Sequence, residues 1–373
     1  MSSPMRVLII GGVAAGPKTA ARVARLNPEA EITVIEKGDF LSYAGCGLPY
    51  YVSGAVHERK ELMATAAGVV RDAAFFQKVK NVRIRNATKA LCIDRAAKRV
   101  GIAPASQAGD VPAEWLPYDT LVLCTGARPV IPLLPGMDRK QVHTLHSVED
   151  ADAVCARLSE GKGLKAVIVG GGLIGVEMAE SLVARGCAVT VVERLPQILG
   201  ILDENMAKLV ERHMQAKGVR VLTNTAVEAI LGRSGDDAAV GAVKTSAGDI
   251  PADFVIVSVG VRPNAELAKA AGLTLGEKTG AIVVDDRMRT SDPDILAAGD
   301  CAEVKHLVTG RGVFVPLGST ANKQGRVAAN TICGVPDAFP GVLGSAVCRV
   351  FDFTVARTGL TEREARALGI DCT

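Results

Sequence analysis

The stretch AVIVGGGLIGVEMAESLVARGCAVTVVE, residues 166–193, predicts a strand, a glycine turn, a helix and a second strand. We expect strands over Ala166–Val169 and Ala188–Glu193, with a helix over Val176–Arg185 between them. Gly170–Gly175 contains the complete Gly-x-Gly-x-x-Gly pattern between strand and helix. Such glycines allow a tight turn, close approach of a pyrophosphate at the helix N-terminus and close packing of helix on strand. The stretch therefore predicts a dinucleotide-binding βαβ unit.

The carboxylate at the end of the second strand, Glu193, indicates which nucleotide this unit binds. A carboxylate there accepts hydrogen bonds from a ribose diol and repels a 2′-phosphate, so it favours NADH over NADPH. The neighbouring Arg194 weakens this preference and keeps NADPH open as the alternative. A glycine turn without a ligand is the other interpretation of the motif, because Gly-x-Gly-x-x-Gly outside its context is a weak signal.

The same order of elements occurs near the N-terminus. We expect a strand over Arg6–Ile10, a glycine turn over Gly11–Gly16 and a helix over Thr19–Leu26. The second strand, Ile32–Glu36, ends in an acid that suits a ribose. This copy is imperfect, because Val13 stands at the middle glycine of the motif. The sequence thus predicts two dinucleotide-binding units.

Two later turns follow buried strands and complete the second nucleotide site. Thr125-Gly126 follows a predicted strand over Leu121–Cys124, and Gly299-Asp300 follows one over Ile295–Ala298. The Asp300 side chain suits a ribitol hydroxyl. Each turn alone fits a structural role equally well, but all of these pieces in this order predict FAD as the second dinucleotide.

The expected fold class is α/β, with two Rossmann-like dinucleotide-binding domains of which the second is inserted in the first. The FAD-binding domain is expected over residues 1–148 and 265–338, and the NAD(P)H-binding domain over residues 149–264. Antiparallel strands are expected over Val82–Val100, because the pattern alternates there.

A third domain is expected to begin near the end of the sequence. Residues 339–373 contain a predicted strand over Val347–Val355 and a capping box, Thr361–Glu364, that starts a short helix. A strand and one short helix cannot bury a core alone, so we expect this domain to be truncated here.

Length and charge argue against several classes of protein. The 373 residues suggest two or three domains, and 43 basic and 40 acidic side chains leave a net charge of +3. The sequence has no long basic run, so neither nucleic acid nor an anionic membrane is an expected partner. It has no apolar run of membrane-spanning length, and a first strand with a phosphate-binding turn explains the apolar stretch Val7–Gly16 better than a signal peptide does. We therefore expect a soluble, cytoplasmic protein.

The nine cysteines are scattered, without a Cys-x-x-Cys or a metal-like pair, so no metal site is expected. In a reducing cytosol most of them should be buried thiols. Cys46 has a different setting in LSYAGCGLPYY, residues 41–51, because flanking glycines and Pro49 keep it out of a core strand. A helix N-terminus or a flavin nearby would favour its thiolate. The alternative is a buried structural thiol.

An ordered set of motifs resembles the FAD-dependent pyridine nucleotide–disulfide oxidoreductases, in the branch with a single redox cysteine. The set spans nearly the whole chain and consists of Gly11–Gly16, Glu36, Ser42–Tyr51, Thr125–Pro129, Gly170–Glu177, Glu193, Gly260–Asn264, Gly299–Asp300 and Leu317–Asn322. The resemblance implies that the cofactors are bound by Gly11, Gly12, Val13, Ala14, Ala15, Gly16, Glu36, Lys37, Thr125, Gly126, Arg128, Gly170, Gly172, Leu173, Ile174, Gly175, Glu193, Gly260, Gly299, Asp300 and Ala321.

The branch with a single redox cysteine contains coenzyme A (CoA) disulfide reductases, CoA-persulfide or polysulfide reductases, NADH oxidases and NADH peroxidases. Two differences from related proteins indicate where this sequence belongs. Members similar to glutathione reductase carry a Cys-x₄-Cys pair, whereas the next cysteine after Cys46 is Cys92. Oxidases and peroxidases usually carry a histidine beside the FAD phosphate turn, where Ala14 stands here. The resemblance therefore favours the reductases that act on CoA compounds.

The resemblance also implies the catalytic and substrate residues. Cys46 would be the redox residue, and Glu177 matches a family glutamate near the nicotinamide. A mainly cationic set would contact CoA, whose phosphates suit such side chains: Lys18, Arg22, Arg25, Ser42, Lys80 and Asn322. A solvated helix face is the alternative for Arg22. Two positions depart from typical CoA disulfide reductases, because Gly45 replaces an asparagine and Asn322 replaces a histidine found in one of them.

The expected function is transfer of hydride from NAD(P)H through FAD to Cys46, which reduces a CoA disulfide, a CoA persulfide or a polysulfide. The alternative is an NADH oxidase or peroxidase that uses a Cys46 sulfenate. An FAD-containing electron carrier is a third interpretation, in which Cys46 is structural. The resemblance further implies a homodimer formed through a C-terminal α+β dimerisation domain.

Overall fold

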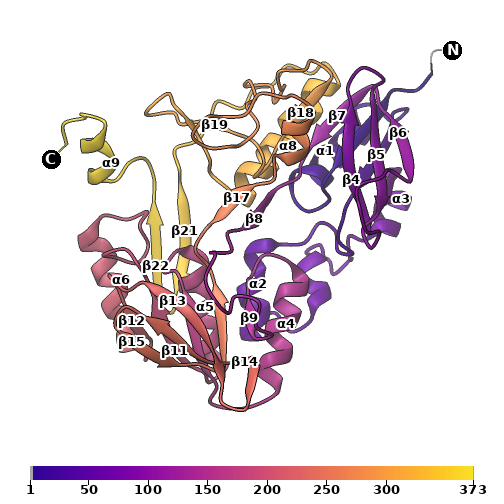
Figure 1. Ribbon diagram of the computed structural model, residues 1–373. Helices are drawn as coiled ribbons and strands as arrows, with labels where there is room; N and C mark the ends of the chain where they lie inside the picture. The colour runs from indigo at the N-terminus through magenta and orange to yellow at the C-terminus, as the bar shows by residue number, and fades with distance from the viewer. Residues whose placement is uncertain (1–2, 373) are drawn as a thin grey trace. The chain divides into compact units, whose positions relative to one another are not determined.

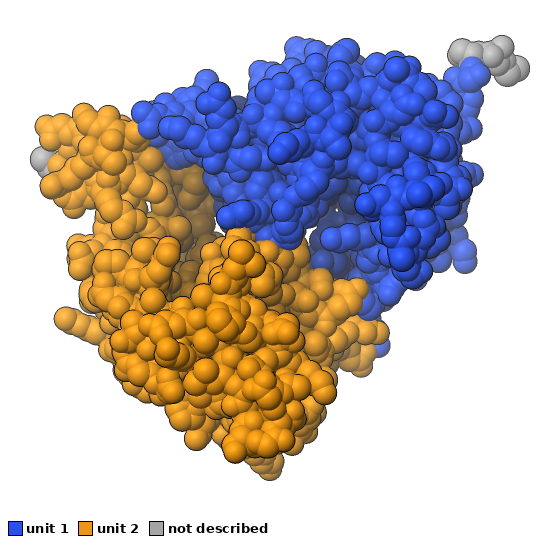
Figure 2. Space-filling view, viewed as in Figure 1, with its two compact units in different colours: residues 1–44, 60–128, 262–342 blue, residues 45–59, 129–261, 343–373 orange. Residues whose placement is uncertain are grey.

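The structure is a computed structural model that describes residues 3–372. The chain forms two compact units (Figure 2). Unit 1 comprises residues 1–44, 60–128 and 262–342, and unit 2 comprises residues 45–59, 129–261 and 343–373. Each unit contains its own parallel sheet, so the expected α/β class is confirmed. The domain boundaries expected from the sequence stay predictions.

Unit 1 is built on a parallel sheet with the strand order β18-β7-β1-β2-β3, of which β7 and β18 are labelled in Figure 1. In that order the strands are Ile295–Ala297, Thr120–Leu123, Arg6–Ile10, Glu31–Ile35 and Val82–Arg85. Strand β1 is apolar after its first residue because both faces of the sheet are covered. Alternate residues of β1 enter two different cores, Val7 and Ile9 on one face and Leu8 and Ile10 on the other.

Helices cover one face of this sheet and an antiparallel sheet adjoins the other. The core with Val7 also contains residues of α1 (Ala15–Leu26) and α8 (Gly318–Ile332). The core with Leu8 contains residues of β5 (Arg99–Pro104). The remaining elements of unit 1 include α3 (Ala73–Lys80), β4 (Thr88–Asp94), β6 (Glu114–Pro117), α7 (Glu266–Ala270), β19 (Val304–Lys305) and β20 (Gly312–Val313). The short helix η2 (Arg59–Met63) and the strands β8 (Ala127–Pro129) and β17 (Val261–Pro263) lie where the chain passes between units.

The expectation of antiparallel strands over Val82–Val100 is partly wrong. Strands β4 and β5 do pair antiparallel, but β3 runs parallel to β2. Helix α3 lies between β2 and β3 in the chain and provides the crossover that a parallel pair requires. The sequence pattern alone does not distinguish these two pairings.

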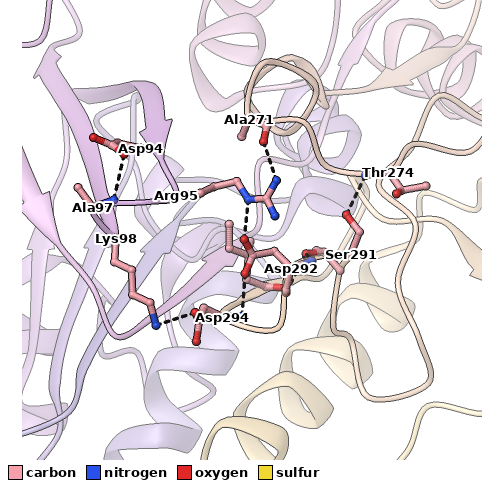
Figure 3. Close-up of polar contacts among 11 residues, drawn as sticks. Asp94, Arg95, Ala97, Lys98, Ala271, Thr274, Ser291, Asp292 and Asp294 are labelled. Carbon is pink, nitrogen blue, oxygen red and sulfur yellow. Dashed lines mark hydrogen bonds and ion pairs between the residues drawn. The ribbon is translucent and has the colours of Figure 1, made fainter.

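Ion pairs join the turn between β4 and β5 to the loop before β18 (Figure 3). Arg95 Nε lies 2.5 Å from Asp292 Oδ2, and Lys98 Nζ lies 2.6 Å from Asp294 Oδ2. Burial, together with the charges of Asp292 and Asp294, raises the pKa of Tyr118 to about 12, so its phenol stays neutral. These contacts connect β18 with segments far from it in sequence, and a buried carboxylate such as Asp292 requires a partner of this kind.

Unit 2 contains a second parallel sheet with the order β12-β11-β10-β16-β9. In that order the strands are Arg220–Leu222, Ala188–Val192, Lys165–Val169, Phe254–Val257 and Val142–His143. A meander of β13 (Val227–Arg233), β14 (Asp236–Thr245) and β15 (Gly248–Pro251) shares a core with this sheet. The helices of unit 2 are α2 (Leu48–Ser53), α4 (Val148–Ser159), α5 (Leu173–Ala184), α6 (Glu204–Ala216) and α9 (Glu362–Ala367), and η1 (Gly45–Gly47) precedes α2.

Both predicted βαβ units are present, but their helices begin earlier than expected. Helix α1 begins at Ala15 rather than Thr19, and α5 begins at Leu173 rather than Val176. The reason is that the last glycine of each turn already belongs to the helix. A Cβ on Gly175 would lie 2.1 Å from the carbonyl oxygen of Gly170, so glycine lets the first helical turn pack directly on the strand end.

The C-terminal segment is a hairpin rather than the single strand expected over Val347–Val355. Strands β21 (Ala346–Val350) and β22 (Phe353–Arg357) pair antiparallel around a turn in which Phe351 has a φ of 56°. This turn contains neither glycine nor proline, so the sequence carries no ordinary turn signal there. The capping box is confirmed, because the Thr361 hydroxyl accepts the backbone N–H of Glu364 and the Glu364 carboxylate accepts that of Thr361.

Candidate functional site

The first glycine turn lies at the carboxyl end of β1, in unit 1. A Cβ added to Gly11 would lie 2.0 Å from the carbonyl oxygen of Cys124, and one added to Gly12 would lie 2.7 Å from Leu41 Cδ2. Helix α1 starts at this turn, and its N-cap residue, Ala14, makes no side-chain capping bond. The backbone N–H groups of the first helical turn are therefore suited to an anionic group such as a pyrophosphate.

Glu36 is held against this turn by backbone hydrogen bonds. The N–H of Gly12 donates to Glu36 Oε2 at 2.6 Å, and the N–H of Gly38 donates to Oε1 at 2.8 Å. The side chain is buried, and the next residue, Lys37, is exposed. A carboxylate has about four lone-pair positions, so the fixed Glu36 can still accept bonds from a ribose diol.

The other turns predicted for this site lie at neighbouring strand ends of the same sheet. The Thr125 hydroxyl donates to the Asn264 carbonyl at 2.6 Å, and Asn264 Nδ2 donates to the Thr125 carbonyl at 2.9 Å. Gly126 has a φ of 68°. The exposed Arg128 donates to Asn264 Oδ1 at 2.9 Å and pairs with Glu266.

Two buried polar groups in unit 1 test whether the residues fit a dinucleotide. The N–H of Gly299 donates to Gln324 Oε1 at 2.8 Å, while the fully buried Gln324 Nε2 makes no hydrogen bond among the described residues. Burial raises the pKa of Asp300 to about 6. Ala321 lies beside Gly299, where a glycine Cβ would be 3.6 Å from its Cβ. A glycine cradle, an unpartnered amide and a desolvated carboxyl group fit FAD, which has phosphate, ribose and ribitol groups to bind.

The second glycine turn, in unit 2, repeats the hydrogen bonds of the first. The N–H of Gly171 donates to Glu193 Oε2 at 2.8 Å, and the N–H of Leu195 donates to Oε1 at 2.7 Å. Gly172 is the N-cap of α5 and makes no side-chain capping bond. A Cβ on Gly170 would lie 2.5 Å from the Ser258 carbonyl oxygen. Gly260 is exposed after β16. This duplication of geometry matches the duplicated sequence pattern.

Cys46 lies in the helical turn η1, directly before α2. All nine cysteines are within the described residues, and Cys46 is the exposed one, whereas the other eight are partly or fully buried. A side chain at Gly45 would meet no atom within 4 Å, so space does not require glycine there. Further back in the loop, the buried Ser42 has a φ of 51° and its N–H donates to the Gly12 carbonyl at 2.8 Å.

Helix α2 is anchored to α4 and α5 by groups that sequence reasoning missed. The Tyr51 hydroxyl donates to Asp152 Oδ1 at 2.9 Å, and Arg59 pairs with Asp152 Oδ2 at 2.8 Å. The Ser181 hydroxyl donates to the Pro49 carbonyl at 2.8 Å. No motif indicates these residues, because their partners are about a hundred positions away.

A cavity of about 320 Å³ lies beside α2 and α5 in unit 2 and contains the predicted Glu177. It is also lined by Tyr50, Glu180 and Arg349, among other residues. Burial, with a further contribution from the Glu180 charge, raises the pKa of Glu177 to about 7. Sequence reasoning did not predict Glu180 or Arg349 here, because the cavity wall includes strand β21 from the far end of the chain.

The residues predicted to contact substrate lie in unit 1, mostly on its helices. Lys18, Arg22 and Arg25 project from α1 at positions spaced by four and three residues, which places them on one face. Arg22 Nε donates to Asn330 Oδ1 at 3.0 Å, so this side chain is fixed rather than freely solvated. Lys80 Nζ lies 6.0 Å from the Phe75 ring centroid, and Asn322 is exposed on α8.

Two Rossmann-like units with matching glycine–glutamate turns define a class of protein, the oxidoreductases that bind two dinucleotides. Residues 5–325 match the pyridine nucleotide-disulphide oxidoreductases. The chain belongs to this family, and the resemblance seen in the sequence is confirmed. It is therefore an oxidoreductase of a family that uses FAD and NAD(P)H.

Several characterised proteins are similar over nearly the whole chain. The NAD(P)H sulfur oxidoreductase (CoA-dependent) of Pyrococcus abyssi is 38% identical, covering 98% of this chain and 78% of the relative. The NADH oxidase of Methanocaldococcus jannaschii is 36% identical, covering 96% and 76%. The solved structure of an NAD-dependent persulfide reductase from A. fulgidus is 46% identical, with a TM-score of 0.93, and covers 98% of this chain. This chain spans 66% of the length of that protein.

Within residues 3–372, no helix is both long enough and apolar enough to cross a lipid bilayer. The same part of the chain has no group of three or more histidine, cysteine or acidic side chains arranged to hold a metal ion.

Proposed function

We propose that this chain is an NAD(P)H-dependent flavoenzyme that reduces a sulfur–sulfur bond at Cys46, in a CoA disulfide, a CoA persulfide or a polysulfide. The observation that carries the proposal is the setting of Cys46, an exposed thiol between two glycines at the start of α2. An exposed thiol before a helix is accessible to a substrate. The name of the Pyrococcus abyssi relative supports a CoA-linked sulfur substrate.

The residues of the chain bind and orient the reactants. Gly11–Gly16 and Glu36 would hold the pyrophosphate and ribose of FAD, with Asp300 at the ribitol. Gly170–Gly175 and Glu193 would hold the corresponding parts of the pyridine nucleotide. When bound, FAD supplies the transfer of two electrons from the reduced nicotinamide to sulfur. The remaining predicted cofactor residues, Lys37, Thr125, Gly126, Arg128, Gly260, Gly299 and Ala321, would shape the two sites.

We propose NADH as the preferred donor, with NADPH as the alternative. Glu193 is fixed by two backbone N–H groups, so it cannot turn away from an incoming 2′-phosphate without losing both bonds. The exposed Arg194 beside it favours NADPH.

The cations of α1 support a CoA-linked substrate. Lys18, Arg22 and Arg25 on one helical face suit the phosphates of CoA, and Ser42, Lys80 and Asn322 would complete the contact. We also propose that the protein forms a homodimer, as the resemblance to the family implies. We further propose that it is located in the cytoplasm.

Rapid mixing of the reduced protein tests this function. The protein is reduced anaerobically with NADH and then mixed with CoA disulfide, CoA persulfide or peroxide, while the flavin absorbance is followed. We expect fast reoxidation by a CoA–sulfur compound in the wild type and its loss in Cys46→Ser. The matched control, Cys372→Ser, replaces a thiol outside every helix and strand and should behave as wild type.

A second candidate function is that of an NADH oxidase or peroxidase, which the Methanocaldococcus jannaschii relative favours by its name. Reoxidation by oxygen or peroxide alone, with CoA compounds inert, would replace the first proposal with this one. Loss of the reaction in Cys46→Ser would then indicate a sulfenate at Cys46. A reoxidation that survives in Cys46→Ser would instead support an electron carrier.

A further inference from the structure

The cationic face of α1 carries a positive charge that no acid compensates. Within residues 3–372, the side chains of Lys18, Arg22 and Arg25 form no ion pair, and α1 itself contains no acidic residue. Arg85 of the same unit, by contrast, pairs with Glu114 at 2.7 Å. A cluster of unpaired cations attracts an anion.

Arg22 differs from the other two cations because a side chain of α8 holds its guanidinium. Arg22 Nε donates to Asn330 Oδ1 at 3.0 Å, and Asn330 is only 4% exposed. An arginine carries five N–H donors. In the part of the chain that the structure describes, Nη1 and Nη2 of Arg22 make no hydrogen bond. These two groups are therefore available to a phosphate, which can accept both at once.

The Asn330 amide has one defined orientation. Its Nδ2 donates to Asp337 Oδ2 at 2.6 Å, and the other oxygen of Asp337 accepts the backbone N–H of Ala338 at 3.0 Å. The donor end of the amide thus faces a carboxylate and its acceptor end faces Arg22. A flip of the amide would lose both bonds, so the acceptor for Arg22 Nε stays in place.

Asn330 also separates the charge of Arg22 from the nearby acid. Asp337 Oδ2 lies 3.6 Å from Arg326 Nη2, so the ion pair of this carboxylate is with Arg326. A carboxylate at position 330 would hold the guanidinium as well, but it would compensate the positive charge. The neutral amide fixes the position of Arg22 and leaves its charge to attract an anion.

Close packing of α1 on α8 brings these residues together from positions 308 apart in the sequence. The Thr19 hydroxyl of α1 donates to the Gly325 carbonyl of α8 at 3.0 Å. A Cβ on Gly325 would lie 2.6 Å from the carbonyl oxygen of Ala15, so a larger residue would push the helices apart. The contact between Arg22 and Asn330 therefore depends on the fold and leaves no local motif.

We propose that Asn330 is a positioning residue for the CoA-linked substrate, which fixes Arg22 through Nε so that both Nη groups bind a phosphate of CoA. This inference rests on the proposed function, because it takes a CoA compound as the substrate. An arginine loses rotamer freedom when it binds a ligand, and a bond that fixes it beforehand reduces this entropy cost. Asn330 acts through Arg22 and not on the substrate itself.

A double-mutant cycle on the FAD-loaded full chain tests the proposal. CoA binding is measured by titration calorimetry in the Cys46→Ser protein, which cannot form a mixed disulfide at that position. We expect Asn330→Ala to weaken CoA binding by about 3- to 10-fold, the range for immobilising one long side chain. In the Arg22→Ala background, Asn330→Ala should have no further effect, because the group through which it acts is absent.

Two more variants refine the result. Asn330→Asp should weaken CoA binding at least as much as Asn330→Ala, because the new carboxylate compensates the guanidinium. Arg311→Ala, the matched control for charge, removes an exposed cation between β19 and β20 of the same unit and should bind CoA as before.

Unchanged CoA affinity in Asn330→Ala would overturn the inference, as would a loss that persists in the Arg22→Ala background. If the buried substitution prevents folding, Arg22→Lys gives the decision, because lysine keeps the charge but cannot bond Asn330 and bind a phosphate bidentately. Full CoA affinity in Arg22→Lys would then overturn it.

A failure of the proposed function has a different signature. The cycle then shows the expected coupling in CoA binding, while CoA disulfide does not reoxidise the reduced flavin of the protein that retains Cys46. Absence of any CoA binding to the protein would overturn both proposals.

Discussion

The duplicated turns provide a paired test in which each site is the control for the other. Glu36 and Glu193 each accept two backbone N–H bonds of 2.6–2.8 Å from their own glycine turn and from a residue two positions later. We consider Glu36→Gln and Glu193→Gln. Each change keeps the shape of the side chain, but it replaces an accepting oxygen with an NH₂ group that faces a donor.

The magnitude follows from the bonds that each carboxylate makes. A hydrogen bond to a charged group contributes about 1.5–3 kcal/mol, and an amide can keep only one of the two backbone bonds. Each variant should therefore lose about 2 kcal/mol in the free energy of unfolding of its own unit. Loss of one charge-assisted bond to a ribose hydroxyl should weaken the bound nucleotide by about 10- to 150-fold.

Equilibrium binding checks the prediction. The affinity of the apoprotein for FAD is measured by flavin fluorescence, and the affinity of the oxidised holoprotein for NAD⁺ by calorimetry. Glu36→Gln should weaken FAD and leave NAD⁺ affinity unchanged once FAD is saturating, and Glu193→Gln should do the reverse. Equal effects of both variants on both ligands, or no effect of either, would refute the assignment of one nucleotide to each turn.

Two further predictions concern the second unit. Gly175→Ala should lower NAD⁺ affinity and the melting temperature, because the new Cβ would lie 2.1 Å from a carbonyl oxygen, whereas Gly172→Ala meets nothing within 4 Å and should retain the wild-type melting temperature. The raised pKa of Glu177, about 7 when folded, means that the folded state binds more protons than the unfolded chain between about pH 4.3 and 7. Its contribution to stability is therefore complete below about pH 4.3 and is lost as the pH rises to 7, by about 1–2 kcal/mol after allowance for partial exposure. Chemical unfolding across this range should show that loss relative to Glu177→Gln, and parallel curves for the two proteins would contradict the raised pKa.

The sequence was sufficient for the two nucleotide-binding units because their requirements are local. A tight turn against a strand end admits only glycine, and the acid at the end of the next strand is reached through neighbouring backbone. Gly11, Gly12 and Glu36 form such a set, and Gly170, Gly171 and Glu193 do so again. Physical constraints confined to about thirty consecutive residues leave a readable pattern.

Strand pairing was predicted less well where neighbours in sequence are not neighbours in the sheet. The apolar positions of Val82–Arg85 fit either a parallel or an antiparallel partner, and the crossover through α3 decides between them. The hairpin turn at Phe351 was missed because a left-handed φ at a phenylalanine has no compositional signal. In both cases packing against distant segments selects the geometry.

The sequence by itself determined the family, the two dinucleotide-binding turns and the selection of Cys46 as the candidate redox cysteine. Each of these depends on a short run of residues with strict steric or chemical requirements. Only the tertiary structure decided which groups surround the helix that follows Cys46. Glu177 and Glu180 lie on the same helix, whereas Arg349 lies about 170 residues later in the sequence, and all three meet Tyr50 around one cavity. The properties that matter there, burial of a carboxyl group and compensation of its neighbour by a guanidinium, are set by distance in space, which the order of residues does not contain.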